Sequence, residues 1–356
     1  MFSATAACST AWRTPFVGLL LLLGACRQTP HVQTMPALGP GAPMTLAVPG
    51  ARALAPSIAA RSPYVAVSFT TSDSRGAMVY LATSDDNGAT FSSPLPISDD
   101  GGAQSSSVHT RITDDASVGA QPPQVRVEWT RADGTRSARA LNPWKAGRKQ
   151  QPITVPSRGL QATATCTPDG EVLLVAGQRG PLDVSVNHRL AEETCASRVP
   201  AALIDARQWA HVAWIAGADD EAARVLYAAS SDREWFGGAQ EVVAPGQRPA
   251  HLTMVTDPND TVVMTWDGDM AGRRHVFLRQ LLPAHHGTAT LLPQTRLSTD
   301  GGGVEPATAS ITGGVVVAWR EPATGTIVVR RVGLDAICET TPAPTAGAPA
   351  AMVSAR

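Results

Sequence analysis

The stretch Val315-Val316-Val317-Ala318-Trp319 decides the fold of this 356-residue chain, because variants of it recur along the sequence. Five further runs are apolar or alternating and most close on an aromatic residue: residues 65–69, 125–129, 172–176, 211–214 and 262–266. β-Branched residues that lead to an aromatic, without an apolar stripe of period 3.6, predict strands. Successive runs start 39 to 60 residues apart. The chain is therefore expected to repeat one strand-based unit.

A second phrase precedes four of these runs by a nearly constant distance. It begins at a proline, and 13 to 17 residues separate that proline from the closing aromatic: Pro56, Pro200, Pro249 and Pro306. A polar loop and a third apolar run follow, as at residues 77–83, 224–229, 274–279 and 326–330. Four-stranded units that recur at about 40–50 residues are typical of a β-propeller. A two-domain β-sandwich protein is the alternative, and it does not explain the constant offset.

We therefore predict an all-β chain with one six-bladed β-propeller over residues 51–338. The blades are expected near residues 51–100, 101–158, 159–197, 198–245, 246–300 and 301–337. The second blade lacks the proline phrase at its expected place. The Pro-, Ala- and Thr-rich segment 339–356 is expected to be a disordered tail.

The N-terminus has the pattern of an export signal. Arg13 precedes a short apolar run at residues 17–23, which is too short to span a bilayer as a helix of about 20 residues. Leu23-Gly24-Ala25-Cys26 follows at once and resembles the lipobox of bacterial lipoproteins. The resemblance implies removal of residues 1–25, lipid on Cys26 and, with Arg27 next, delivery to the outer membrane. An ordinary secretory signal with Cys26 as a plain thiol is the alternative.

Residues 26–50 lack periodicity and are expected to be a tether, so that membrane contact runs through the lipid alone. Export places the remaining cysteines in an oxidising compartment. Cys166 with Cys195 is the preferred disulfide because both lie in one repeat, and buried free thiols remain the alternative. No Cys-x-x-Cys motif or His–carboxylate spacing predicts a metal or another cofactor.

Charge excludes one class of partner. The chain has 29 Lys and Arg against 30 Asp and Glu, so it has no strong field to hold a polyanion. Nucleic acid is therefore not an expected partner.

One motif carries a resemblance to a known family. Ser84-Asp85-Asp86-Asn87-Gly88-Ala89-Thr90-Phe91 resembles the Asp-box, or BNR repeat, of the sialidase-like propellers. Ser84, Asp86, Gly88, Thr90 and Phe91 match the pattern, and a turn of this kind fixes the fold rather than catalysing a reaction. The stretch from Ser230 to Phe236 holds the same place in a later unit but lacks the glycine.

The resemblance implies an exo-α-sialidase or a related glycoside hydrolase, but key residues are missing. Active sialidases hold the substrate carboxylate with three arginines and use a tyrosine nucleophile. In the family, the first of these arginines lies in an Arg-Ile/Val-Pro sequence on the first strand of the first blade. Here Leu54-Ala55-Pro56 occupies that place and lacks the arginine, whereas Arg198-Val199-Pro200 matches the sequence in the fourth unit. No tyrosine follows Tyr227, although the nucleophile normally comes late in the chain. Loss of the nucleophile favours a non-catalytic scaffold over the hydrolase. Such a scaffold is expected to be a monomer that binds a glycan or an envelope protein.

Propeller loops that gather on one face suggest a binding surface. The loops before the first strands and between the second and third strands bring arginines and carboxylates to that face, and the candidate ligand face consists of Arg198, Arg248, Asp267, Asp269, Glu305 and Arg320. Arginines among carboxylates can clasp an anionic or hydroxylated ligand. The alternative is a set of solvated loop charges that pair only with each other. His251 and His275 fall in predicted strands and are interpreted as structural or exposed.

Overall fold

A computed structural model describes the chain over residues 41–73, 76–98, 103–113, 123–131, 133–144, 161–166, 172–177, 200–217, 219–231, 236, 238–257, 259–284 and 288–334. All of these belong to a compact unit of residues 37–356. Within these ranges every regular element is a strand or bridge, and none is a helix able to cross a membrane. Cys26, Cys195, Arg198 and segments 1–25 and 339–356 lie outside the described residues, as does the side chain of Cys166.

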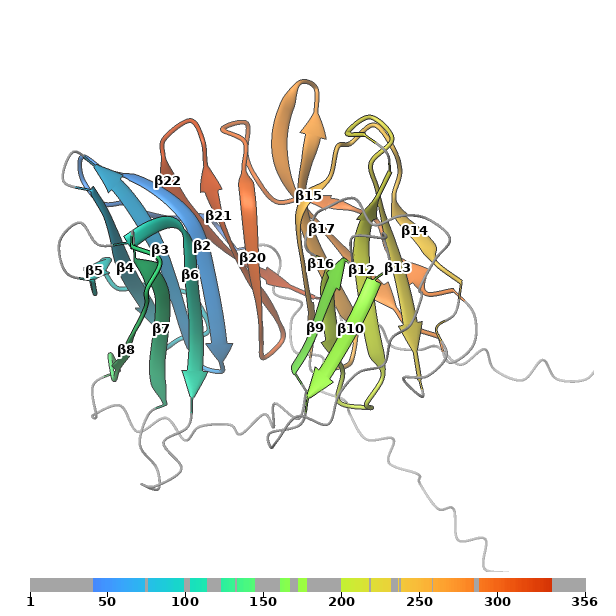
Figure 1. The fold of residues 1–356 in the computed structure, drawn as a ribbon, viewed down its shortest axis with the longest axis horizontal. Helices are drawn as coiled ribbons and strands as arrows, with labels where there is room; N and C mark the ends of the chain where they lie inside the picture. Colours follow the sequence, from blue (N-terminus) through green and yellow to red (C-terminus); the bar gives the residue numbers. More distant parts are fainter. Residues whose placement is uncertain are drawn as a thin grey trace, which may run out of the picture. The chain divides into compact units, whose positions relative to one another are not determined.

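The described strands form six antiparallel sheets in chain order (Figure 1). The first contains β2 (Arg52–Arg61), β3 (Tyr64–Asp73), β4 (Gly76–Ser84) and β5 (Leu95–Pro96). The second contains β6 (Ala103–Thr113), β7 (Gln124–Arg131) and β8 (Arg136–Leu141). The third contains β9 (Gln161–Cys166) and β10 (Val172–Gly177).

The fourth and fifth sheets follow the same order. The fourth contains β11 (Ala201–Ile204), β12 (Ala210–Ala216), β13 (Arg224–Ser230) and β14 (Gln240–Val243). The fifth contains β15 (Ala250–Thr256), β16 (Val262–Met270), β17 (Arg273–Leu282), β18 (Thr290–Leu291) and β19 (Thr295–Arg296). The sixth contains β20 (Val304–Ile311), β21 (Gly314–Glu321) and β22 (Thr326–Gly333), completed by β1 (Met44–Leu46).

The first strands of most neighbouring sheets lie next to one another. The contacting pairs are β2 with β6, β9 with β11, β11 with β15, β15 with β20, and β20 with β2. The last of these pairs joins the sixth sheet to the first, as a closed propeller requires. The fold is therefore all-β and propeller-like, whereas the number of blades in the ring remains a prediction.

Strand β1 changes the expected domain boundary. Met44, Thr45 and Leu46 pair with Val329, Val328 and Ile327 of β22, so the start of the fold supplies the outer strand of the last sheet. Leu46 is buried in the core between the first and sixth sheets. The tether expected over residues 26–50 thus ends earlier, and the folded region begins before the expected residue 51.

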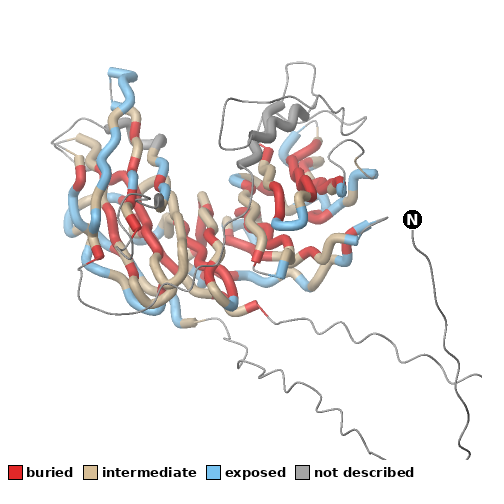
Figure 2. Tube along the Cα trace, turned by 90° about the horizontal axis from the view of Figure 1, so that it is seen from below, coloured by how far each residue is buried: buried red, intermediate tan, exposed pale blue. Residues whose placement is uncertain are grey.

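The core follows the period-two pattern of the strands. Along β16, Met264 and Trp266 are buried with residues of the fourth sheet, whereas Val263 packs with the sixth sheet. Because successive side chains alternate between faces, each middle strand fills two interfaces at once. Figure 2 shows buried residues running along the strands.

The proline phrase marks a repeated β-bulge. Ladder registers shift between Leu54 and Ser57, between Ala250 and Thr253, and between Val304 and Ala307. The residue before each proline has a left-handed backbone, with φ of 45° at Ala55, 46° at Arg248 and 57° at Glu305. This conformation is costly for non-glycine residues, and proline normally directs its predecessor to extended backbone. Strain and bulges of this kind cluster where side chains are re-aimed at a site.

The segment from Ser84 to Phe91, which resembles an Asp-box, forms a tight turn after β4. Ser84 Oγ donates to Asp86 Oδ1 at 2.7 Å and accepts from Gly88 N at 2.8 Å. Asp86 also accepts from Thr90 N and Thr90 Oγ1, at 2.9 and 2.6 Å. Gly88 has φ of 77°, and a Cβ there would lie 2.8 Å from Val316, while Phe91 packs on the same core. The turn therefore fastens the first sheet against the sixth and has a structural role.

Arginines in three third strands connect neighbouring sheets. Arg139 of β8 donates to Ile97 O at 3.0 Å, and Arg330 of β22 donates to Leu297 O at 2.8 Å. Arg279 of β17 donates to Val242 O in the same way. Each acceptor lies at the outer strand of the preceding sheet, so the three guanidinium groups act as repeated inter-sheet links.

Candidate functional site

One end of the fifth sheet carries a polar row toward the sixth sheet. Val263, Thr265, Asp267 and Asp269 alternate along β16 and share the face that packs on β20. The Thr265 hydroxyl lies 2.6 Å from the Thr308 hydroxyl of β20, and Asp267 lies one alternation further along. The row thus changes from apolar to acidic toward the face expected to bind ligand.

Asp267 is the centre of this site, and its side chain has no exposed surface. Its Oδ1 accepts from His251 Nδ1 at 2.7 Å and from Glu305 N at 3.4 Å. Its Oδ2 accepts from Arg274 Nε at 2.6 Å. A buried carboxylate is tolerated only where donors satisfy it, and these three donors come from three different strands, β15, β17 and β20. Asp267 therefore organises the site rather than facing a ligand.

Arg248 connects this centre to the fourth sheet. Its guanidinium pairs with Glu221, in the loop between β12 and β13, and lies 3.5 Å from Asp269. Asp269 lies 3.7 Å from Arg274 as well. The Arg274 guanidinium also donates to the backbone oxygen of Arg248 at 3.2 Å. The two arginines are thus held side by side by shared acceptors.

Glu305 and Arg320 form the other half of the site. The Arg320 guanidinium makes a bidentate contact with the Glu305 carboxylate, at 3.2 and 3.1 Å. Glu305 Oε2 also accepts from Ala55 N of β2, at 3.2 Å. Bidentate guanidinium–carboxylate pairs fix geometry as well as charge. The two strained bulge residues Ala55 and Glu305 therefore meet across the contact between the first and sixth sheets.

The electrostatics of His251 follow from these neighbours. Its hydrogen bond to Asp267 raises the pKa of the imidazole, and the negative charges of Asp267 and Glu305 raise it further against the opposing effect of burial. Because Nδ1 donates to Asp267, the Nε2 edge of the ring is left for solvent or a ligand, and the side chain is 53% exposed. His251 is therefore an oriented hydrogen-bonding group on the surface of the site, with Nε2 an acceptor in the neutral ring and a donor in the protonated one.

The candidate ligand face is largely brought together. Arg248, Asp267, Asp269, Glu305 and Arg320 all join one set of direct contacts. The sequence interprets His251 as structural or exposed; its side chain is half exposed, and its contact with Asp267 was not predicted. Arg274 was also missed, although its place in a third strand beside two aspartates was a usable signal.

We call these eight residues the mixed-charge network: Glu221, Arg248, His251, Asp267, Asp269, Arg274, Glu305 and Arg320.

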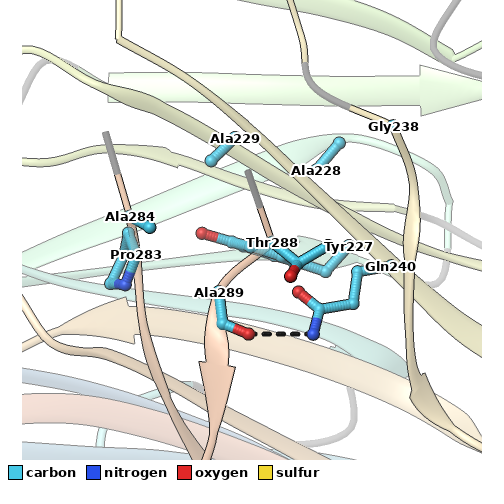
Figure 3. Close-up of a pocket in the computed structure, with 9 residues that line it drawn as sticks. All are labelled: Tyr227, Ala228, Ala229, Gly238, Gln240, Pro283, Ala284, Thr288 and Ala289. Carbon is cyan, nitrogen blue, oxygen red and sulfur yellow. Dashed lines mark hydrogen bonds between the residues drawn. The ribbon is translucent and has the colours of Figure 1, made fainter. Parts of the chain in front are cut away.

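Each of the three described tyrosines already has a partner in the core or in a neighbouring strand. Tyr227 is buried, its hydroxyl lies 2.7 Å from His211 Nδ1, and burial raises the pKa of the phenol. It lines a small pocket with Gln240, whose side chain donates to Ala289 O at 2.8 Å (Figure 3). Tyr80 stacks on Phe69, and Tyr64 packs on Trp144. These partners of the three described tyrosines, His211, Phe69 and Trp144, all lie outside the mixed-charge network.

The described side chains also bear on metal chemistry. None of their His, Cys, Asp and Glu residues form a group of three or more arranged to hold a metal ion.

Comparison with known proteins gives similarity in structure alone. No protein-family model matches the chain, and no curated protein matches its sequence. The NanB sialidase of Streptococcus pneumoniae is similar with a TM-score of 0.45 and 9% identity over 80% of this chain and 68% of that one. The Trypanosoma rangeli sialidase gives 0.39 and 11% over 79% and 54%. The α-L-arabinofuranosidase PaAbf62A of Podospora anserina gives 0.35 and 10% over 82% and 96%. Likeness at this level transfers no activity or ligand.

Proposed function

We propose that this chain is a non-catalytic carbohydrate-binding propeller of the bacterial cell envelope, and that the mixed-charge network is its binding surface. The observation that carries the proposal is the pairing of the network's acidic groups. Both oxygens of Asp267 accept hydrogen bonds, and Glu305 is held by Arg320 in a bidentate contact. A retaining hydrolase needs a free nucleophile and a separate acid beside it. Paired carboxylates suit binding better than either role.

The chemistry of the surface favours a sugar. Guanidinium groups present several donors in a fixed plane, and carboxylates present acceptors beside them, which matches the neighbouring hydroxyls of a saccharide. Arg248 and His251 are about half exposed, while Arg274 is one-third exposed. A protein partner of the envelope is the competing occupant, and the binding test separates the two.

The test uses the purified full chain in mild detergent. We expect no turnover of a fluorogenic sialoside and saturable retention on an oligosaccharide array. Arg320→Ala should lose most of that retention, whereas Arg136→Ala, which removes an exposed arginine from β8, should keep it. Turnover that disappears in Arg248→Ala would establish the hydrolase alternative. Retention on envelope proteins but on no oligosaccharide would replace the sugar with a protein partner.

Attachment to the envelope through Cys26 is part of the proposal and rests on the lipobox resemblance. Metabolic labelling with a palmitate analogue should mark the chain, and the Cys26→Ser variant should remain unlabelled. Equal labelling of both forms would refute lipidation at this residue.

A further inference from the structure

We infer that the ligand of the mixed-charge network is an uncharged, polyhydroxylated sugar and not an acidic one. This inference rests on the proposed function and specifies the class of ligand. It follows from the charge balance of the described network and from the way in which its cations are already engaged.

The network carries no excess of positive charge. It contains three arginines, Arg248, Arg274 and Arg320, against four carboxylates, Glu221, Asp267, Asp269 and Glu305. Its net charge is therefore −1 when His251 is neutral and zero when His251 is protonated. An anionic ligand would bring another negative charge to a surface that does not attract one.

Each arginine is already shared between acceptors of the protein. Arg274 binds the buried Asp267 at 2.6 Å, and Arg320 donates through Nε and Nη2 to the two carboxylate oxygens of Glu305. A ligand carboxylate that took either guanidinium would leave Asp267 or Glu305 with fewer donors. A buried charge that loses its partner is strongly unfavourable. Capture of an acidic sugar by these arginines therefore competes with the contacts that build the site.

A hydroxyl group has no such conflict. It donates one hydrogen bond and accepts others, so it can lie between a guanidinium and a carboxylate without displacing either. The exposed Nε2 edge of His251 accepts a hydrogen bond when the ring is neutral and donates one when it is protonated, and the partly exposed carboxylate of Asp269 provides an acceptor on the same surface. Hydrogen-bonding groups placed side by side in this way match the neighbouring hydroxyls of an uncharged sugar ring.

The experiment compares matched sugars on the purified full chain. Oligosaccharides that end in glucose or galactose are immobilised beside their glucuronic or galacturonic acid counterparts and beside a sialylated galactoside. We expect retention on at least one neutral sugar, at about tenfold or more above its acidic counterpart. We also expect retention on that sugar to change little between 50 and 300 mM salt, because a neutral sugar forms no ion pair that salt could screen.

A charge variant makes the test specific to the network. Glu221→Gln removes one negative charge at the exposed rim, so it should narrow the preference for neutral sugars. Glu128→Gln, at a partly exposed position of β7 that also pairs with an arginine, is the matched control. Equal or stronger retention of the acidic counterparts by the unmodified chain would overturn the inference while leaving the proposed function standing. Retention of no sugar at all would refute both.

Discussion

Replacement of Asp267 by asparagine should destabilise the protein, because this carboxylate holds three strands together from a fully buried position. The side chain keeps its shape in Asp267→Asn but loses its charge. The contacts at stake are those with His251 Nδ1 at 2.7 Å and Arg274 Nε at 2.6 Å. Glu305 N, at 3.4 Å, is a weaker third donor.

The size of the effect follows from those contacts. A hydrogen bond that involves a charged group contributes about 1.5–3 kcal/mol. Arg274 and His251 are 33% and 53% exposed, so water offsets part of each loss, and the low end of that range applies. Two such contacts give a decrease of about 3 kcal/mol in the free energy of unfolding. For a domain of this size we expect Tm to fall by roughly 5 °C.

The matched control is Asp269→Asn on the same strand. Asp269 is partly exposed and lies 3.5 and 3.7 Å from its arginines, so its loss should cost less than about 1 kcal/mol. Urea denaturation of both variants, followed by tryptophan fluorescence, measures the difference. Equal losses within about 0.5 kcal/mol would refute the central role given to Asp267.

Three further predictions concern the same fold. Arg330→Met should lower the free energy of unfolding by about 2 kcal/mol, because two backbone oxygens lose a charged donor, and Arg136→Met should lower it by less than about 0.5 kcal/mol in the same denaturation assay. Deletion of residues 41–50, which contain β1, should lower the Tm measured by calorimetry, whereas deletion of residues 28–38 should not. The same Tm for both deletion variants would show that β1 does not stabilise the fold. Finally, the raised pKa of His251 predicts that its contribution to stability is full below pH 6.5 and is lost as pH rises through the higher folded value. The stability difference between the native chain and His251→Gln should therefore shrink from pH 5.5 to pH 9, and a difference that grows would contradict the assignment.

The strand repeat was predictable because its physics is local. β-Branched runs that end in Phe69, Trp214, Trp266 and Trp319 place one large side chain per unit in the core, and this pattern is visible in a single sequence. The proline offset was also visible, although the left-handed backbone before each proline was not. The pairing of β1 with β22 could not be predicted, since three residues with no periodicity contain no record of a partner almost 300 positions away.

The binding surface was predictable only in outline. Propeller loops are expected to gather on one face, and this expectation placed five residues together there. The observed contacts join all five: Arg248, Asp267, Asp269, Glu305 and Arg320. The sequence could not rank them by burial, so it did not distinguish the buried Asp267 from the partly exposed Asp269. It also did not predict the contact of His251 with Asp267, because a β-bulge aims this side chain and the period of the strand does not reveal a bulge.

A crystal structure of the full chain with a bound neutral oligosaccharide tests the central claim most directly. The probe is whichever glucose- or galactose-terminated sugar the full chain retains most strongly. We predict intact sugar over the mixed-charge network, with ring hydroxyls within hydrogen-bond distance of Arg248, His251 and Asp269 while the pairs of Asp267 with Arg274 and of Glu305 with Arg320 stay closed. Sugar bound instead in the pocket beside Tyr227, or a cleaved sugar over the network, would contradict the account.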